Sequence, residues 1–198
     1  MRKDYEIILN LIPENSKVLD IGCSDGELIT YLENKGISAQ GVELNQEKVI
    51  KCLEKGLDVI HGDINLIVED FPFNQFDYCL LTQTIQAVQE PDQLLNTLKK
   101  VSKNIIVSFN NSARLSKISN FLLTGSFDSL LKKANSDHWY NTDNIHPCSY
   151  KDYKKLATDL DLKIISTFDV LSQKKFENGK IPSNLFCKEV LFHITNEQ

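Results

Sequence analysis

Residues 22–26, Gly-Cys-Ser-Asp-Gly, admit two chemical interpretations. As G-x-S-x-G they would form the nucleophile elbow of a serine hydrolase, with Ser24 as the nucleophile. As a glycine-cornered turn from a strand into a helix they would hold a cofactor, because a helix N-terminus directs free N–H groups and a positive dipole at a carboxylate or phosphate. The hydrolase interpretation fails because only one predicted helix precedes the turn, so no earlier strand supplies the oxyanion loop. The turn therefore predicts a cofactor site.

An acidic residue stands where a nucleoside site needs one. Glu43 ends the next predicted strand, and a carboxylate at that place accepts hydrogen bonds from vicinal ribose hydroxyls. Gly22 and Gly26 allow tight turning and a close approach of the backbone to the ligand. The dinucleotide fingerprint G-x-G-x-x-G is not matched, because serine separates the two glycines. The turn and the acid together predict a nucleoside cofactor other than a nicotinamide dinucleotide.

Residues 137–146 carry side chains suited to acid–base chemistry. Asp137, His138, Tyr140 and His146 are candidate general bases, of which we retain Tyr140 and His146. The alternative is structural: His146 would hydrogen-bond to loop backbone, and Tyr140 would pack at a rim. The acidic and histidine residues here match no standard metal-site spacing, so we expect no metal. The N-P-P-Y type signature is absent, so no particular nucleophile is indicated.

The elements that must position these residues alternate between strand and helix. Strands are predicted at 17–22, 38–44, 57–64, 76–85, 104–111, 163–172 and 188–195, and helices at 4–12, 25–36, 45–56, 91–102 and 150–162. Such alternation predicts an α/β fold with a mostly parallel sheet and helices on both faces. The last two strands follow one another without a helix, so they are expected to form a C-terminal antiparallel hairpin. Residues 110–149 show no sheet pattern and are the expected lid or substrate region.

The composition sets outer bounds on the function. The chain has 198 residues, of which 41% are hydrophobic and 25% charged, which fits one globular domain over 1–198. A net charge of −5 argues against a nucleic-acid partner, and no segment is apolar and long enough for a signal peptide or a membrane span. The 5 cysteines are dispersed, which predicts reduced thiols and a cytoplasmic location. Cys23 could have a lowered pKa near a helix N-terminus, but a buried spacer role is favoured.

The motif order resembles that of the class I S-adenosylmethionine-dependent methyltransferases. "LDIGCSDGEL" resembles their motif I, D/E-x-G-x-G-x-G, and "GVEL", "HGD" and "FDYCLLTQ" follow in the family's order. The resemblance implies a Rossmann-like seven-stranded sheet with one antiparallel strand. It also implies that S-adenosyl-L-methionine is the cofactor, with S-adenosyl-L-homocysteine as the product. The cofactor-binding residues that it implies are Asp20, Gly22, Cys23, Ser24, Gly26, Glu43, Leu44, Asp63, Ile64 and Gln83.

A closer resemblance, over the whole chain, is to the MetW group of methionine-biosynthesis proteins. The stretches that carry it are "RKDYEIILNLIPENSKVLDIGCSDGEL", "FPFNQFDYCLLTQTIQAVQEPDQLL", "IVSFNN" and "WYNTDNIHPCSYKDY". It implies a partnership with homoserine O-acyltransferase on the route to methionine. The group's own reaction is not evident from sequence.

Two departures from these patterns affect the expected function. Ser24 stands where motif I has its central glycine, and its Cβ either weakens cofactor binding or is accommodated at negative φ. The segment "NNSARLSKISNFLLTG" after the fifth strand also departs from the family pattern, so the surface facing the substrate differs. Three functions stay open: a cofactor-binding partner or sensor, a methyltransferase acting on an oxygen or carbon nucleophile of a small molecule, and a structural module with a decayed site.

Overall fold

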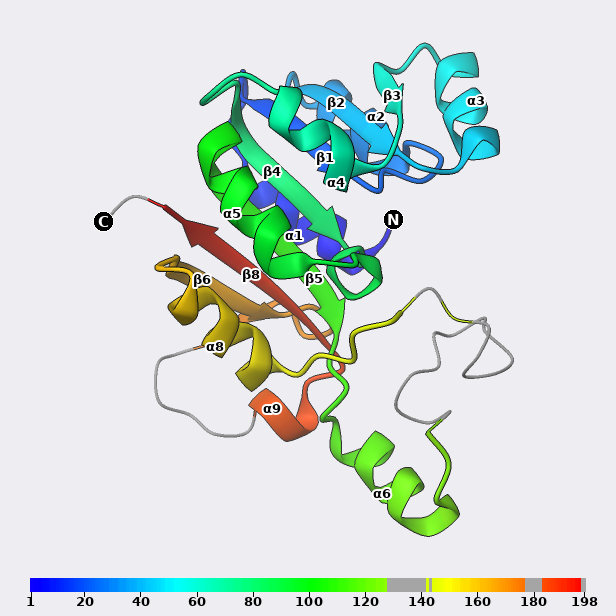
Figure 1. Ribbon diagram of the computed structural model, residues 1–198, viewed down its shortest axis with the longest axis vertical. Helices are drawn as coiled ribbons and strands as arrows, with labels where there is room; N and C mark the ends of the chain where they lie inside the picture. The colour runs from blue at the N-terminus through cyan, green and yellow to red at the C-terminus, as the bar shows by residue number, and fades with distance from the viewer. Residues whose placement is uncertain (128–141, 143, 177–182, 197–198) are drawn as a thin grey trace.

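One mixed sheet of eight strands runs through the molecule in the order β3-β2-β1-β4-β5-β8-β6-β7 (Figure 1). The computed structural model describes residues 1–127, 142, 144–176 and 183–196. Strands β1 to β5 are parallel, and β8 runs antiparallel between β5 and β6. The fold predicted from the alternating pattern and the C-terminal antiparallel pair is therefore confirmed.

The parallel half of the sheet contains the segments that carry the motifs. Its first elements in chain order are α1 (Lys3–Leu11), β1 (Lys17–Ile21), α2 (Glu27–Asn34), β2 (Ser38–Glu43), α3 (Gln46–Glu54) and β3 (Val59–His61). They are followed by α4 (Ile64–Ile67), the 3-10 helix η1 (Val68–Asp70), β4 (Phe76–Thr82), the 3-10 helix η2 (Ile85–Ala87), α5 (Pro91–Val101) and β5 (Ser102–Asn110). The register pairs Ile21 with Val42 and Glu43 with His61. Because the strands are parallel, the carboxyl ends of β1, β2 and β4 lie at one edge of the sheet.

The remaining elements complete the sheet beyond β5. They are α6 (Leu115–Thr124), α8 (Tyr150–Asp159), β6 (Lys163–Asp169), β7 (Lys174–Lys175), α9 (Ser183–Phe186) and β8 (Glu189–Thr195). Eight strands are present where seven were expected, because the short β7 pairs with β6 inside the polar loop that precedes α9. The predicted lid spans β5 to α8 and lies partly outside the described residues, so that role stays a prediction. No helix among the described residues combines the length and apolarity needed to span a bilayer.

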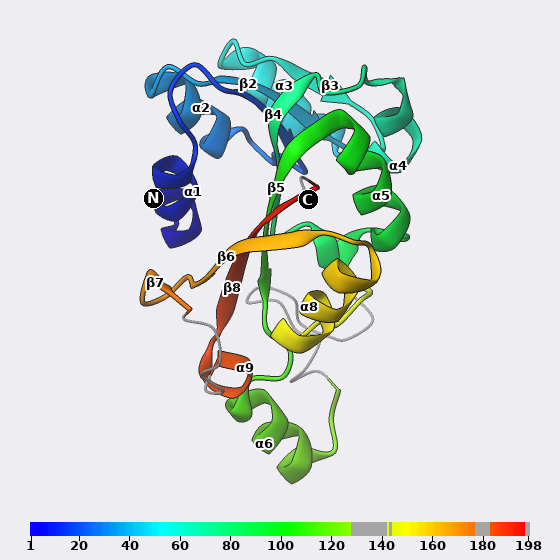
Figure 2. The ribbon, with the colours of Figure 1, turned by 90° about the vertical axis from the view of Figure 1, so that its left-hand side faces the viewer.

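Alternate strand residues point to opposite faces of the sheet and build two apolar cores. Val18, Leu80 and Ile106 pack with α1, α2 and Cys52 of α3, whereas Leu19 and Leu81 pack with α4, α5 and α8. Figure 2 shows α1 and α2 on one side of the sheet and α5 and α8 on the other. Fully burying each large apolar side chain stabilises the fold by about 1.5–3 kcal/mol. Both faces of the central strands are therefore covered by helices.

Polar residues set where several helices begin. Asn45 caps α3, its side chain accepting a bond of 3.2 Å from the amide of Lys48. Ser149 and Asp152 form a reciprocal capping box at the start of α8, and Pro91 is the first residue of α5. The cap at Asn45 matters most for the site, because it fixes the chain directly after Glu43.

Candidate functional site

The turn after β1 is folded against the end of β2. The amides of Gly22 and Cys23 donate bonds of 2.8 and 3.2 Å to the carbonyl of Val42. Gly22 and Gly26 have φ of 72° and 75°, which an L side chain rarely adopts. Cys23 is buried, and burial raises the pKa of its thiol, so this cysteine is not poised as a thiolate. We call the segment Gly22–Gly26 the corner.

Glu43 fixes the corner from the end of β2. Its Oε2 accepts a bond of 2.9 Å from the amide of Ser24, and its Oε1 accepts a bond of 2.9 Å from the amide of Asn45. The side chain is only 7% exposed. One carboxylate thus joins the corner to the start of α3, and each of its oxygens keeps a lone pair for a ligand hydroxyl.

Of the two alternatives left open for Ser24, the structure excludes accommodation at negative φ. Ser24 is not accommodated at negative φ but lies in the left-handed region, at φ 55°. Its amide must face Glu43, and its carbonyl accepts a bond of 3.3 Å from the Cys52 thiol. These two contacts hold the residue in a conformation that costs a non-glycine residue about 1–2 kcal/mol.

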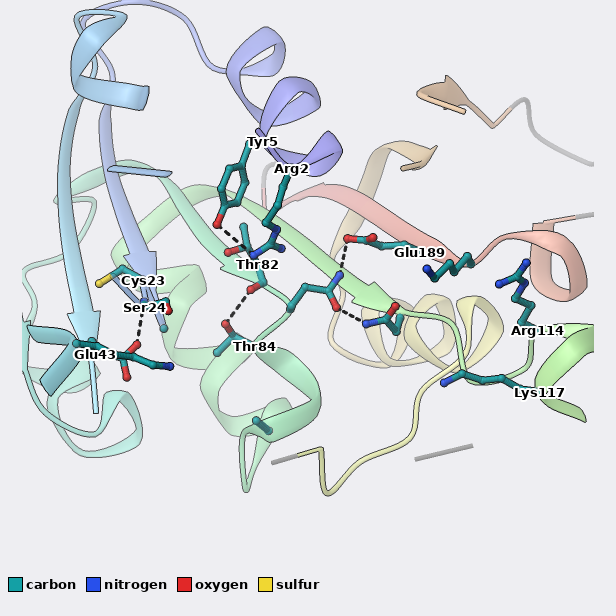
Figure 3. Close-up of a pocket in the computed structure, with 16 residues that line it drawn as sticks. Arg2, Tyr5, Cys23, Ser24, Glu43, Thr82, Thr84, Arg114, Lys117 and Glu189 are labelled. Atoms are coloured by element: carbon teal, nitrogen blue, oxygen red, sulfur yellow. Dashed lines mark hydrogen bonds between the residues drawn. The ribbon is translucent and has the colours of Figure 1, made fainter. Parts of the chain in front are cut away.

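Two cavities meet at this corner. The larger, of about 660 Å³, runs from the corner along the ends of β4 and β5 to the start of β8 (Figure 3). The smaller, of about 580 Å³, runs past the end of β2 to the start of α4. Gly22, Glu43, Lys48, Thr84 and Ala87 line both. Both volumes fall within the range of small-molecule sites, and Glu43 stands where the two cavities join.

Most of the predicted cofactor residues line one of the cavities. Those of the larger cavity are Gly22, Cys23, Ser24, Glu43 and Gln83, and those of the smaller are Gly22, Glu43, Leu44, Asp63 and Ile64. Asp20 and Gly26 line neither. The structure thus brings eight of the ten predicted residues to two adjoining cavities.

Of the two candidate bases, His146 lies among the described residues and does not reach the cavities. His146 is exposed and lines neither cavity; its Nε2 lies 3.0 Å from the carbonyl of Gln89. Its amide also donates a bond of 3.0 Å to the carbonyl of Gln86. These contacts match the structural alternative of a histidine bonded to loop backbone. Tyr140 lies outside the described residues.

Asp20 is a buried carboxylate without a hydrogen-bond partner in the described part of the chain. Neither of its oxygens is satisfied, and the side chain is 1% exposed. Burial raises its pKa to about 7; Arg2 opposes this effect, while Asp4 and Glu43 add to it. The group lies in β1 directly before the corner, so a cation bound there would stabilise its ionised form.

A hydrogen-bond network at the larger cavity was not predicted from the sequence. Asn110 Nδ2 donates a bond of 2.7 Å to Gln83 Oε1, and Gln83 Nε2 donates a bond of 2.6 Å to Glu189 Oε1. Gln83 has φ 60°, which turns its side chain between β5 and β8. Burial raises the pKa of Glu189 to about 7. Glu189 follows a polar loop, and only strand pairing reveals that it faces Gln83.

Two residues near the N-terminus of the chain, Arg2 and Tyr5, also line the larger cavity and were not predicted from the sequence. Arg2 pairs with Asp4 at 2.5 Å and donates a bond of 3.1 Å to the hydroxyl of Tyr5. Asp4 is 1% exposed and accepts a further bond of 3.1 Å from Ser108 in β5. This anchor places Arg2 and Tyr5 over the cavity in Figure 3. The only sequence signal was an acidic residue within an otherwise apolar helix face.

Several solved structures with the same architecture are S-adenosylmethionine-dependent methyltransferases, and one is the [4+2]-cyclase SpnF. A TehB-like enzyme of this class from Corynebacterium glutamicum aligns with a TM-score of 0.66 at 14% identity, over 100% of this chain and 89% of that chain. A second, from Methanosarcina mazei, aligns with a TM-score of 0.67 at 17% identity, over 96% of both chains. At such identities the likeness establishes the Rossmann-like methyltransferase fold and nothing about substrates.

Sequence comparisons narrow the relationship further. The chain is 30% identical over 205 aligned positions to the bifunctional methionine biosynthesis protein MetXA/MetW of Rhodopirellula baltica. That alignment covers 98% of this chain but only 33% of the relative, so the chain spans about a third of that protein's length. The family profile described as methionine biosynthesis protein MetW matches residues 2–194. The chain therefore belongs to the MetW family.

Proposed function

We propose that this protein binds S-adenosyl-L-methionine at the corner and serves methionine biosynthesis together with homoserine O-acyltransferase. One observation carries the first part: Glu43 is held by two backbone amides at the junction of two cavities. A carboxylate fixed there is ready to accept hydrogen bonds from two vicinal hydroxyls without being reorganised.

The residues around Glu43 fit an adenosyl group. In the smaller cavity, Ile64 and the 66% exposed Leu44 offer apolar surface to a planar base. Asp63 Oδ1 accepts bonds of 2.9 and 2.8 Å from Asn65, which hold the carboxylate where it can meet an exocyclic amine. On the other side of Glu43, the corner backbone suits an amino-acid end, and the buried carboxylate of Asp20 behind it adds a negative potential that favours an ammonium group. The donor and acceptor set thus matches base, sugar and amino acid in sequence along one groove.

The proposed partnership with homoserine O-acyltransferase is supported by the composition of a related protein. The Rhodopirellula baltica protein joins a MetXA part and a MetW part in one chain. We infer that this chain likewise acts beside a homoserine O-acyltransferase, so that binding of S-adenosylmethionine at the corner changes the rate of acyl transfer to homoserine.

Two measurements test this proposal separately. Calorimetric titration with S-adenosyl-L-homocysteine should give one saturable site per chain; its absence would refute cofactor binding. Co-expression with tagged homoserine O-acyltransferase from the same organism should copurify the two chains, and the acyl-transfer rate should change on addition of S-adenosylmethionine. An acyltransferase that neither copurifies with this chain nor changes its rate when the two are present at equimolar concentration would refute the partnership.

A second candidate function is methyl transfer to a small oxygen or carbon nucleophile, favoured by Glu189. When bound, the cofactor supplies a methyl group that its sulfonium already makes electrophilic. The chain would then have to align a nucleophile and hold its proton. Glu189 lines the larger cavity with a pKa of about 7, which suits a general base near neutral pH. Release of S-adenosyl-L-homocysteine, lost in Glu189→Gln, would establish this activity; a broad acceptor panel without release would exclude it.

A further inference from the structure

Three basic side chains gather at the end of the larger cavity away from the corner. Arg114, Lys117 and Lys188 line this part together with Glu189, and we call these four residues the far end. Figure 3 shows Glu43 and Ser24 on one side of the cavity and Arg114 and Lys117 on the opposite side, with Thr82 between them. The far end is therefore separate from the group of residues assigned to the nucleoside.

The fold brings the basic residues together through a buried asparagine. Asn111, 0% exposed, follows β5 and is fastened to the chain that enters β8. Its amide donates a bond of 2.9 Å to the carbonyl of Lys188, and its Nδ2 donates a bond of 3.0 Å to the carbonyl of Cys187. Its Oδ1 accepts a bond of 3.1 Å from the amide of Ala113, which sets the turn that carries Arg114. The basic residues thus project from a preformed junction of two segments.

Neither Arg114 nor Lys188 has an ion-pair partner among the described residues. Burial lowers the pKa of Lys117, and the positive charges of Arg114 and Lys188 lower it further. Among the described residues that line the far end, Glu189 is the one carboxylate, and Gln83 already donates a hydrogen bond to it. Two cations without an ion-pair partner, beside one carboxylate that is already hydrogen-bonded, attract an anion.

The surroundings restrict the anion to a small molecule. The cavity is about 660 Å³ in all, and part of that volume belongs to the corner. The chain as a whole carries a charge of −5, so an extended polyanion would meet repulsion outside the cavity. Arg114 offers the planar fork that binds carboxylate or phosphate oxygens in pairs, and the lysines add point charges.

We propose that the far end binds the anionic group, carboxylate or phosphate, of a small organic molecule, held by Arg114, Lys117 and Lys188. Glu189 then faces a neutral or cationic part of the same molecule. The inference rests on the proposed function for the assignment of the corner to the cofactor; it adds that the second ligand of the site is an anion.

The test is a ¹H–¹⁵N NMR titration of the full chain at low ionic strength with three probes: glutarate, inorganic phosphate and the neutral analogue glutaramide. Both anions should bind saturably, at least about tenfold tighter than glutaramide, because charge-assisted bonds are lost in the amide. The tighter of the two anions identifies the preferred group. Equal binding of glutarate and glutaramide would overturn the proposal.

Variants locate the binding and separate charge from structure. Arg114→Gln and Lys117→Gln should each weaken glutarate binding about tenfold, Lys117→Arg should retain it, and Glu189→Gln should strengthen it roughly threefold by removing a like charge. Lys154→Gln, which changes an exposed lysine of α8 that lines neither cavity, is the matched control. Thermal unfolding checks that each variant folds. Equal affinities across folded variants would place the anion elsewhere and refute the inference.

Repeating the titration with saturating S-adenosyl-L-homocysteine distinguishes this inference from the proposed function. Glutarate binding that persists supports two ligands side by side. Competition would overturn the inference, because the basic residues would then hold the cofactor's own carboxylate. If S-adenosyl-L-homocysteine does not bind but glutarate does, the anion site stands and the proposed cofactor function fails.

Discussion

Replacing Glu43 with alanine should damage both the corner and its ligand site. The change removes an acceptor for two amides at 2.9 Å in a side chain that is 7% exposed. A hydrogen bond to a charged group contributes about 1.5–3 kcal/mol, and water in the cavity replaces part of it. We therefore expect the free energy of unfolding to fall by about 2–4 kcal/mol. The loss of contacts to two ribose hydroxyls should weaken the binding of S-adenosyl-L-homocysteine by about 1–3 kcal/mol, or roughly 5- to 150-fold in affinity.

Calorimetric titration and urea unfolding measure the two effects on the same samples. Glu43→Gln is informative because its NH₂ group would face the amide of either Ser24 or Asn45, which places two hydrogen-bond donors opposite each other. This variant should therefore lose nearly as much stability and affinity as Glu43→Ala. Glu47→Ala removes an exposed carboxylate from the first turn of α3 and is the matched control, expected to bind like the wild type. A folded Glu43→Ala protein with unchanged affinity would refute the assignment of Glu43 to the ribose.

Three further predictions concern stability. The pKa of Asp20 is raised to about 7 in the folded state, so its contribution to the free energy of unfolding is greatest below about pH 4 and is lost as the pH rises through 7. Asp20→Asn should therefore flatten the decline in melting temperature between pH 5 and 8. An unchanged slope would contradict this. Asp4→Ala should cost about 2–3 kcal/mol in urea unfolding, because it unpairs Arg2 and leaves the buried Ser108 hydroxyl without its acceptor. Ser24→Gly should raise stability by up to about 1 kcal/mol, since glycine accepts φ 55° freely, and a loss of stability would show that the left-handed conformation is not strained.

The parallel sheet and its ligand edge were predictable because both are local in sequence. Each strand–helix unit can be predicted from the spacing of its apolar residues and from the glycine or asparagine at its ends. The corner and Glu43 lie within two successive units of this kind. The family resemblance then supplied residues such as Asp63, which the structure places as the cap of α4.

What could not be predicted depends on contacts between distant segments. The bond from Ser108 to Asp4 joins residues 104 positions apart, and nothing near either residue indicates it. The same holds for Glu189, which meets Gln83 only because β8 inserts beside β5. The positive φ of Ser24 could not be predicted, because the contacts that hold it come from β2 and α3 and not from its neighbours in sequence.

The most direct test of the account is a crystal structure of the protein with S-adenosyl-L-homocysteine. We expect both ribose hydroxyls within hydrogen-bond distance of the Glu43 carboxylate, the adenine beside Ile64 with its amine toward Asp63, and the amino-acid end on the corner. Density for the ligand at another place, or a groove left empty at saturating concentration, would contradict the central claim.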